Sequence, residues 1–511
     1  MKAKYIFETA WEVCNKIGGI HTVLASKSPA IQPEYGDNYF FVGPDVWMET
    51  TKNPEFTEDK TLLSDWVNHA RRQGINFRIG RWNISGNPIA ILVDFKPYFG
   101  EKDKIFASWW ETYKLDSISG GWDYVEPALF GYAAGQLIDN FQQFHGVYQD
   151  GIVAHFHEWM TASAILYLKE KNPSIATVFT THATVMGRSI AGNGLPLYDN
   201  IQQYNPEIVA REFSIVAKHS LEKIAAENAD SFTTVSEVTN NECTYFLRKP
   251  VDIVTPNGFD KDLLIESTDR NDIKQQRKHL LKVAEKMTDI NFDEDTMLVM
   301  ISGRYEYRNK GIDIFLSSIA KLKERLNSKR ILAFLMIPAG IKGPDNELIY
   351  ALNGKTENLK FKRHTHSLTD ELYDSIHRKM DSLNLLNAEK DLLTVINVPA
   401  YLHGNDGIFN QKYYDLLPAF DLTLFPSYYE PWGYTPLESI AFGVPTVTTT
   451  LSGFGKWVHS NFENSKGVSI VPRGDYNDEA VINNISELIF GFYTADKNQI
   501  KQSQIDALKI A

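Results

Sequence analysis

Residues 422–438 read LTLFPSYYEPWGYTPLE, and this stretch indicates the fold more strongly than any other. The four apolar or β-branched residues 422–425 predict a short buried strand. Thr435 is expected to cap a following helix, with Pro436 at its first position and Glu438 completing a capping box. A strand that passes through a tight turn into a helix is the repeating unit of a parallel α/β sheet.

The same alternation of short apolar runs and longer amphipathic segments continues along the chain. Apolar residues at three- and four-residue spacing predict helices at 161–168 and 208–226. Such alternation is typical of parallel sheets covered by helices on both faces. Besides 422–425, strands are predicted at 39–42, 89–93, 152–156, 176–180, 231–235, 253–255, 297–301, 331–337, 393–398 and 444–448.

The length of 511 residues predicts two large domains. The chain becomes charged and helical between about 258 and 295, which places a boundary there. We therefore expect a first domain at 1–260 and a second at 261–490, both of the doubly wound Rossmann-like type. A charged, helix-prone region at about 341–390 is interpreted as an insertion in the second domain.

The composition is that of a folded globular protein, with 43% hydrophobic and 23% charged residues. The net charge of −12 gives no support to binding of nucleic acid or anionic membranes. Cys14 and Cys243 form neither a disulfide framework nor a zinc-ligand pattern. Glu8 and Glu12 interrupt the N-terminus too early for a signal peptide, and no run of 18 apolar residues occurs. A soluble cytoplasmic protein is expected.

Local capping explains Thr435 and Glu438, but it explains neither Glu430 nor Gly433. A bare backbone at a helix N-terminus, with the positive end of the helix dipole, suits a diphosphate. Glu430 and Glu438 are too far apart in sequence to form a close carboxylate pair on one helix face. We interpret them as separate contacts, Glu430 to a sugar and Glu438 to another hydroxyl-bearing part of the same ligand.

The segment EPWGYTPLE at 430–438 resembles the signature of glycogen synthases of the animal and fungal type. Further similar segments follow in that family's order along the chain: AWEV at 10–13, NKIGGI at 15–20, GDNYFFVGP at 36–44, HFHEW at 155–159, TTHAT at 180–184, TPNG at 255–258, GRYE at 303–306, NKG at 309–311 and LSGFG at 451–455. The resemblance implies the GT-B fold, in which two Rossmann-like domains face a cleft.

The implied reaction is transfer of glucose from UDP-glucose to the non-reducing 4-hydroxyl of glycogen or a maltooligosaccharide, with retention at the anomeric carbon. No cofactor is expected. A starch-synthase-like transferase that uses ADP-glucose is one alternative. An inactive glucan-binding protein of the same fold is another.

Two cations, Arg304 and Lys310, follow the strand predicted at 297–301. The departing diphosphate gains negative charge that must be neutralised, and the resemblance implies that these side chains replace a metal ion. The Asp-x-Asp triplet at 293–295 is interpreted as solvated surface, and no metal site is predicted. The resemblance also implies that Arg188 is a third cation, which reaches the donor from the first domain.

Lys16, Gly18 and Gly19 resemble the family's K-x-G-G loop, in which the glycines let backbone approach an anion. A Gly-Gly turn is also an ordinary strand-to-helix connection. The placement of the loop at the expected cleft favours donor binding.

His182 follows the strand predicted at 176–180, and the resemblance places it against the transferred glucose. Glu430 is expected to position that glucose, and the backbone of 433–435, including Tyr434, to hold the diphosphate. Tyr413 corresponds to an aromatic residue that stacks on the nucleotide base, with core packing as an equal alternative. His155 and His157 have no evident carboxylate partner, and we expect them to line the cleft or the core.

The C-terminal part of the chain departs from the family pattern. Animal and fungal members carry an arginine-rich helix that binds glucose 6-phosphate, whereas no arginine follows Arg473 here. Strong activation by glucose 6-phosphate is therefore not expected. The segment 491–511 is predicted to be a helix that returns toward the first domain. The insertion at 341–390 could mediate self-association into a homo-oligomer, and a solvated excursion is an equal alternative.

Overall fold

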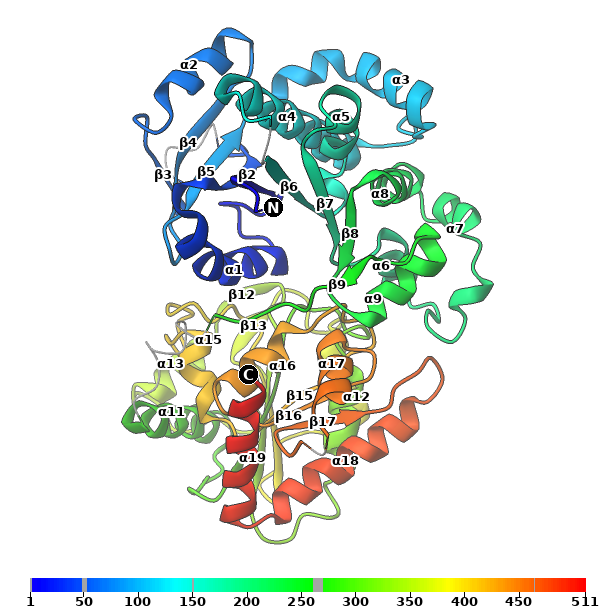
Figure 1. The fold of residues 1–511 in the computed structure, drawn as a ribbon. Helices are drawn as coiled ribbons and strands as arrows, with labels where there is room; N and C mark the ends of the chain where they lie inside the picture. The colour runs from blue at the N-terminus through cyan, green and yellow to red at the C-terminus, as the bar shows by residue number, and fades with distance from the viewer. Residues whose placement is uncertain (1, 48–52, 149–150, 261–269, 464) are drawn as a thin grey trace. The chain divides into compact units, whose positions relative to one another are not determined.

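The computed structural model describes residues 2–47, 53–148, 151–260, 270–463 and 465–511. The chain divides into two compact units, Met1–Asp260 and Lys261–Ala511. The division lies within the region 258–295 where the sequence predicts a boundary, although residues 261–269 are outside the described part of the chain. Each unit has its own sheet and its own core (Figure 1).

The first unit is built on a nine-stranded sheet in the order β3-β4-β5-β2-β1-β6-β7-β8-β9. Only the edge pairings β3–β4 and β4–β5 are antiparallel, and the other strands run parallel. From β5 to β8 the order is that of dinucleotide-binding folds, in which the chain reverses direction across the sheet after its third parallel strand. The strands are β1 (Tyr5–Thr9), β2 (Tyr39–Pro44), β3 (Phe56–Glu58), β4 (Phe77–Trp82), β5 (Ile89–Val93), β6 (Ile152–His157), β7 (Ala176–Thr181), β8 (Ser231–Thr234) and β9 (Ile253–Val254).

Helices cover both faces of this sheet, as Figure 1 shows for α1 on one side and α4 and α5 on the other. The central strand β2 is buried along its whole length, as expected for a parallel strand between two helical layers. The helices are α1 (Gly19–Tyr35), α2 (Ser64–Arg72), α3 (Lys102–Tyr113), α4 (Trp122–His145), α5 (Ser163–Lys171), α6 (Val185–Gly192), α7 (Pro206–Glu212), α8 (Val216–Asn228) and α9 (Glu237–Glu242).

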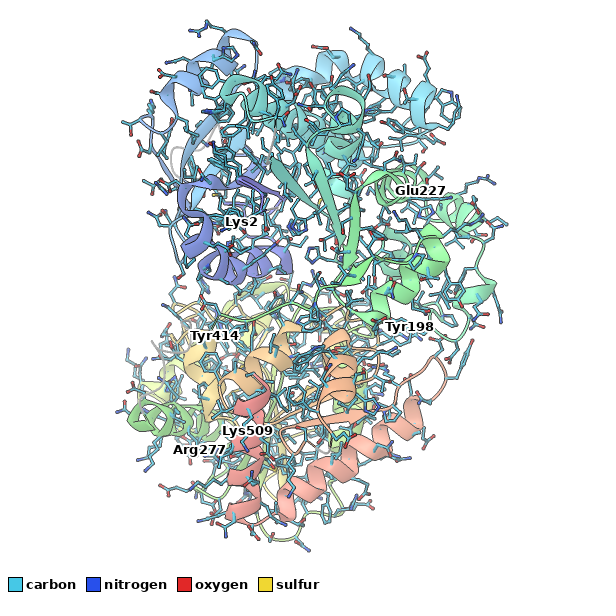
Figure 2. All side chains as sticks on the ribbon, viewed as in Figure 1. Lys2, Tyr198, Glu227, Arg277, Tyr414 and Lys509 are labelled. Carbon is cyan, nitrogen blue, oxygen red and sulfur yellow. The ribbon has the colours of Figure 1, made fainter. Side chains whose placement is uncertain are left out.

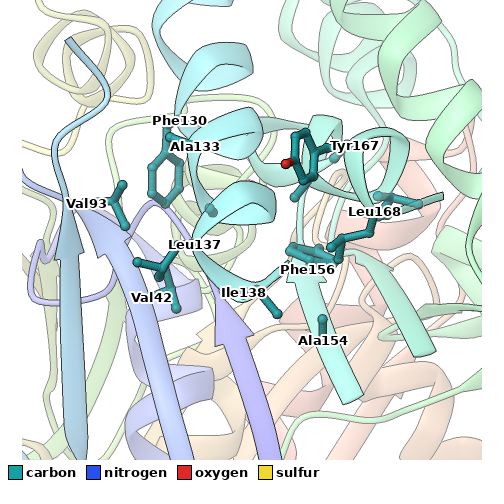
Figure 3. Packing of buried hydrophobic residues seen from close by; sticks show 14 of the residues in the cluster. Val42, Val93, Phe130, Ala133, Leu137, Ile138, Ala154, Phe156, Tyr167 and Leu168 are labelled. Carbon is teal, nitrogen blue, oxygen red and sulfur yellow. The ribbon is translucent and has the colours of Figure 1, made fainter. Parts of the chain in front are cut away.

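The larger core of the first unit forms where α4 and α5 pack on the sheet. Figure 3 shows Phe130 and Leu137 of α4 directed at Val42 of β2, and Leu168 of α5 beside Phe156 of β6. These side chains are buried. This packing fixes the carboxyl ends of β1, β6 and β7, from which the candidate site residues of this unit project.

The second unit contains a six-stranded parallel sheet in the order β14-β11-β10-β15-β16-β17. Numbered along the chain, this order is again 3-2-1-4-5-6. A small antiparallel pair, β12–β13, stands apart from it. The strands are β10 (Met297–Ser302), β11 (Ile331–Met336), β12 (Ile341–Pro344), β13 (His366–Leu368), β14 (Leu393–Asn397), β15 (Leu422–Phe425), β16 (Thr446–Thr449) and β17 (Val468–Val471).

The helices of the second unit lie between and around these strands (Figure 1). Arg277 of α11, labelled in Figure 2, ties this helix to the sheet: its guanidinium donates to the Ala419 carbonyl at 3.0 Å and contacts Asp421 at 3.0 Å. The helices are α11 (Arg270–Thr288), α12 (Ile312–Ala320), α13 (Asn346–Leu352), α14 (Ser375–Ser382), α15 (Tyr413–Leu416), α16 (Tyr434–Ala441), α17 (Gly453–Asn461), α18 (Asp478–Thr494) and α19 (Lys497–Ile510).

The helix predicted at 208–226 is two helices, α7 and α8, and the prediction of one helix was wrong. Ser214, between them, has a positive φ of 56°, which an α-helix cannot accommodate. Some strands were also missed, among them the edge pair β3–β4 and the terminal strand β17. Edge and terminal strands carry a weaker apolar pattern than central ones, because solvent covers part of their surface.

The region 341–390 is not mainly helical, contrary to the sequence-based expectation. It contains β12, β13 and the two short helices α13 and α14. The C-terminal helix α19 packs on α16 within the second unit, whereas we had expected 491–511 to return toward the first domain. Close backbone approach explains this packing, since Gly467 has no side chain where Ala507 of α19 crosses it.

Candidate functional site

In the second unit, the candidate residues follow β10 and β15, which are neighbours in the sheet. The chain reverses direction across the sheet between these two strands, and ligands of such folds bind beyond the strand ends at this position. Arg304 and Lys310 lie in the segment after β10, and Glu430 lies in the turn between β15 and α16. The candidate residues of this unit thus lie in loops that follow two neighbouring strands.

Lys310 and Glu430 form an ion pair in which Nζ lies 2.5 Å from Oε2. Their side chains are 14% and 13% exposed. Ser427 Oγ adds a longer contact of 3.4 Å to the same carboxylate oxygen. A cation and a carboxylate are thus held together in a mostly buried position at the end of the sheet.

Backbone hydrogen bonds join the two loops. The N–H groups of Tyr428 and Tyr429 donate to the Asn309 carbonyl at 2.8 and 3.2 Å. A Cβ at Gly311, which has φ +67°, would overlap the Pro426 carbonyl oxygen. Only glycine therefore permits this approach, and the approach sets Lys310 against Glu430.

A third loop, after β16, supports the Glu430 turn from its other side. The Gly453 N–H donates to the Glu430 carbonyl at 3.0 Å, and Ser452 Oγ donates to the Trp432 carbonyl at 3.0 Å. Gly433 has φ +112°, and a Cβ there would lie 2.9 Å from Ser452 Oγ. The Glu430 backbone is consequently fixed by neighbours on both sides.

The predicted helix cap at Thr435 is wrong, because α16 begins at Tyr434 with Gly433 as its N-cap. The capping box is absent as well. Glu438, the expected second member of the box, instead accepts a hydrogen bond from the Tyr414 hydroxyl at 2.9 Å. Tyr414 is labelled in Figure 2. The left-handed Gly433 starts the helix earlier than a capping threonine would. The buried Tyr434 hydroxyl has no hydrogen-bond partner among the described residues.

Arg304 and Tyr413 occupy the same end of β10 in different ways. The Arg304 side chain is 59% exposed and pairs with Glu306 at 2.8 Å. Arg304 is therefore not part of the Lys310–Glu430 contact. Tyr413 is half-buried, and its hydroxyl is 2.8 Å from Ser302 Oγ at the last position of β10.

In the first unit, His182 belongs to a buried network that the sequence did not reveal. His182 Nε2 lies 3.0 Å from His157 Nδ1, and His157 Nε2 lies 3.2 Å from Glu8 Oε2. Glu8 also contacts Lys27 of α1. The expectation that His155 and His157 have no carboxylate partner was thus wrong, since Glu8 on β1 faces both rings.

Burial and neighbouring charges set the protonation of this network. Burial lowers the pKa of His157 to about 3 and that of His182 well below its usual value, so both rings are neutral at pH 7. Burial alone would raise the pKa of Glu8, but Lys27 and the histidines hold it well below the usual range. A neutral imidazole that faces a ligand can accept or donate a hydrogen bond without bringing a charge.

Glu158 fixes the backbone beside His182. Its Oε1 accepts from the N–H groups of His182 and Ala183 at 3.0 and 3.1 Å. Burial raises the pKa of Glu158 to about 7, against the opposing charge of Arg188. Arg188 is exposed on α6, whereas His182 lies in the loop before this helix.

The glycines of the predicted K-x-G-G loop occupy the start of α1, with Gly18 as its N-cap. The Gly18 N–H donates to Glu12 Oε2 at 2.9 Å, and a Cβ at Gly18 would lie 2.9 Å from Glu12 Oε1. Lys16 is exposed. Glu12 therefore already satisfies a backbone amide that we had expected an anion to reach.

Four residues that were not predicted from the sequence contribute to these sites: Glu8, Lys27, Glu158 and Arg473. Glu8 and Glu158 are acidic residues at the carboxyl ends of strands, which is a usable signal for functional residues. Arg473 follows β17, and its buried guanidinium contacts Asp478 at 3.2 Å and the Pro426 carbonyl. Asp293–Asp295 is an exposed turn before β10, as its interpretation as solvated surface predicted.

Comparison with known proteins assigns the chain to a family. Residues 8–356 and 347–507 match the model of the glycogen synthase family. The chain therefore belongs to the glycogen synthase family of glycosyltransferases. It is 29% identical to the glycogen [starch] synthase of Neurospora crassa over 98% of this chain and 80% of that protein. It is 30% identical to glycogen [starch] synthase isoform 2 of Saccharomyces cerevisiae over 92% of this chain and 78% of that protein.

Solved structures confirm the predicted GT-B fold. The catalytic domain of starch synthase IV from Arabidopsis thaliana, bound to ADP and acarbose, aligns with a TM-score of 0.60 at 16% identity, covering 100% of this chain and 96% of that one. A UDP-forming trehalose-phosphate synthase from Burkholderia xenovorans aligns with a TM-score of 0.53 at 10% identity, covering 99% and 95%. Within the described part of the chain, no helix is long and apolar enough to cross a bilayer.

Proposed function

We propose that this protein transfers glucose from UDP-glucose to the non-reducing 4-hydroxyl of an α-1,4-glucan, with retention at the anomeric carbon. The observation that carries the proposal is the Lys310–Glu430 pair at the switch point of a Rossmann-like sheet. Membership of the glycogen synthase family supports it. Glycogen or a maltooligosaccharide is the proposed acceptor.

The proposed roles in the second unit follow from charge. Lys310 and Arg304 would neutralise the diphosphate as it departs, because fixed cations stabilise charge that develops in the transition state. Glu430 would lie against the donor glucose and stabilise positive charge on it. The backbone N–H groups at the start of α16, 433–435, would hold the phosphates. Glu438 would contact a hydroxyl group of the donor, and Tyr413 its base.

The proposed roles in the first unit require an uncharged histidine ring near the sugar. His182, neutral through burial, would place its ring and backbone carbonyl near the developing positive charge. Lys16, Gly18, Gly19 and Arg188 would complete the donor contacts. The acceptor hydroxyl would attack from the face that the diphosphate leaves, and the departing phosphate oxygen would take its proton. This mechanism needs neither a metal ion nor a cofactor.

The proposal is tested with a Glu430→Gln variant, which keeps the shape of the side chain and removes its charge. Turnover, measured as glycogen-dependent release of UDP from UDP-glucose, should fall by a factor on the order of 10². The Glu479→Gln variant, at a carboxylate that is 86% exposed, serves as the matched control and should retain activity. Near-normal turnover in the Glu430→Gln variant would remove Glu430 from the mechanism.

The donor preference is tested separately with both nucleotides. Wild-type protein and a glycogen primer are incubated with UDP-glucose or ADP-glucose, and incorporation of glucose is measured. We expect a higher kcat/KM with UDP-glucose. A preference for ADP-glucose would favour a starch-synthase-like enzyme, and absence of turnover with both would favour a glucan-binding protein.

We also propose that the enzyme acts in the cytoplasm. The free, buried thiols of Cys14 and Cys243 suit a reducing compartment. Cell fractionation followed by immunodetection tests this proposal, and recovery in a secreted fraction would contradict it.

A further inference from the structure

A second cluster of metal-ligating side chains lies in the region 341–390, apart from the residues assigned to the proposed reaction. His364 precedes β13, Glu371 follows β13, and His377 is on α14. His364 Nε2 lies 2.9 Å from His377 Nδ1. Glu371 Oε1 lies 3.3 Å from His377 Nδ1 and 4.0 Å from His364 Nε2.

These separations match those between the ligands of a small divalent ion. Zinc binds imidazole nitrogens and carboxylate oxygens at about 2.0–2.2 Å, so ligand atoms of a tetrahedral site lie about 3.3 Å apart. The three candidate ligand atoms of the cluster all lie within 4.8 Å of one another. Both histidines are buried, whereas Glu371 is 55% exposed, which leaves one side open to water.

The outer nitrogen of His377 has the partner that a metal-bound histidine requires. Its Nε2 lies 3.3 Å from Asp381 Oδ2, one turn along α14. A carboxylate that accepts the outer N–H of a histidine directs the lone pair of the inner nitrogen at the metal. Arg363 pairs with Asp381 at 2.6 Å and lies 3.3 Å from His377 Nε2, so it neutralises that carboxylate in part.

The outer nitrogen of His364 faces the side-chain amide of Asn397, with Nδ1 3.1 Å from Nδ2. The buried Asn397 Oδ1 has no hydrogen-bond partner among the described residues. A 180° rotation of the amide would let Oδ1 accept from Nδ1–H and would leave Nε2 free as a ligand.

We propose that His364, Glu371 and His377 bind one divalent transition-metal ion, with Zn²⁺ as the best fit. Two imidazoles and one carboxylate form a ligand set that zinc uses, with water in the fourth position. Borderline nitrogen ligands select against Mg²⁺ and Ca²⁺, which prefer oxygen.

The role of the ion is structural and extends to the loop that carries Arg304. Asp374, between Glu371 and His377, accepts a hydrogen bond from the Tyr305 hydroxyl at 2.6 Å. The same hydroxyl accepts from the Ile376 N–H at 3.2 Å. An ion that fixes 371–377 therefore also fixes Tyr305, the neighbour of Arg304.

The described residues contain one other group of this kind, Glu8, His155 and His157. There the Lys27 ammonium contacts Glu8 and lies 3.4 Å from His155 Nδ1. A cation of the protein thus occupies that position, and a metal ion would have to displace it. In the cluster of His364, Glu371 and His377, no lysine or arginine among the described residues is found in contact with any of the three candidate ligand atoms.

The full-length protein, stripped with a chelator and dialysed, is titrated with Zn²⁺ in competition with a chromogenic chelator. We expect one equivalent of zinc and a rise in the thermal midpoint on binding. Co²⁺ in place of Zn²⁺ should produce the visible d–d absorption of a four- or five-coordinate site. His377→Ala should abolish both signals, and Asp381→Asn should weaken zinc binding by about 10- to 100-fold.

Two further variants keep the test decisive. Glu371→Gln alters an exposed side chain that should not affect folding, and it should weaken zinc binding and the cobalt absorption together. His459→Ala, at an exposed histidine of α17, is the matched control and should bind zinc as the wild type does. Zinc binding that is absent from the wild type, or unchanged in His377→Ala and Glu371→Gln, would overturn the proposal.

Discussion

At the scale of single residues, the ion pair of Lys310 and Glu430 is the feature on which the proposed chemistry depends. Each partner is mostly buried, so each has lost much of its hydration and relies on the other. Entry of a diphosphate would offer Lys310 a second anionic partner. The two side chains should therefore act as one functional unit.

This coupling predicts non-additive effects on catalysis. Lys310→Met and Glu430→Gln should each lower kcat/KM by a factor on the order of 10², and the double variant should be no worse than the poorer single one. Steady-state kinetics with UDP-glucose and glycogen measure all three. Lys321→Met, at a surface lysine that is 43% exposed, is the control. Multiplying effects in the double variant would show that the residues act independently.

A second prediction at this scale concerns the hydrogen bond from Tyr414 to Glu438. Tyr414→Phe removes the hydroxyl, and the net loss of one hydrogen bond to a charged group should cost about 2 kcal/mol of the free energy of unfolding. If Glu438 contacts the donor, KM for UDP-glucose should rise while kcat changes little. Urea denaturation and donor saturation curves measure the two effects. Tyr350→Phe, at a residue 49% exposed on α13, should alter neither quantity.

At the scale of secondary-structure elements, the turns after β10 and β15 bring the site together. Gly311 is the N-cap of α12, and its Cα packs closely against the Pro426 carbonyl. No L side chain fits there without displacing one of the two loops. The residue that ends the loop and begins α12 therefore also sets the geometry of the candidate site.

Gly311→Ala should consequently destabilise the fold far more than a glycine replacement that introduces backbone strain alone. Gly354→Ala provides the control, because Gly354 has a similar φ of +68° with no heavy atom within 4 Å of the added Cβ. Strain alone costs about 1 kcal/mol, whereas Gly311→Ala adds a backbone overlap. Thermal denaturation of both variants measures the difference. Equal losses would show that the Gly311–Pro426 approach is not required.

At the scale of the whole molecule, buried carboxylates make stability depend on pH. Burial raises the pKa of Glu222 to about 8 and that of Glu158 to about 7, against about 4.3 for an unfolded chain. The folded state therefore holds protons that the unfolded state releases. This stabilisation is fully present below about pH 4.3 and is lost as the pH rises through the folded-state values.

The thermal midpoint of the wild type should therefore fall between pH 6 and pH 9. Glu222→Gln, which cannot ionise, should show a smaller fall over the same range. Glu227→Gln, on the same helix α8 but exposed (Figure 2), should behave as the wild type does. Calorimetry across this pH range measures the three proteins, and an undiminished fall in Glu222→Gln would refute the assignment.

Much of the fold could be predicted from the apolar periodicity, because central parallel strands are buried on both faces. Runs such as 39–42 and 331–337 are continuous apolar stretches, and both form strands. The break at Ser214 could not be predicted, since nothing in the apolar spacing of α7 and α8 signals a left-handed residue. The start of α16 was predicted two residues late, because the conformation of Gly433 is imposed by Ser452 from another loop.

The sequence alone sufficed for the family, the two-unit parallel architecture and the choice of Glu430, Lys310 and His182 as candidate residues. The family and the candidate residues follow from the resemblance of motifs such as 430–438. The parallel architecture follows from local patterns, in which burial and turn chemistry leave a trace every few residues. The pairing of Lys310 with Glu430, the carboxylate facing His157 and the cluster of His364 with His377 became apparent only in three dimensions. Each joins residues on separate strands and loops, and strand order and register, which no local pattern encodes, set their distances.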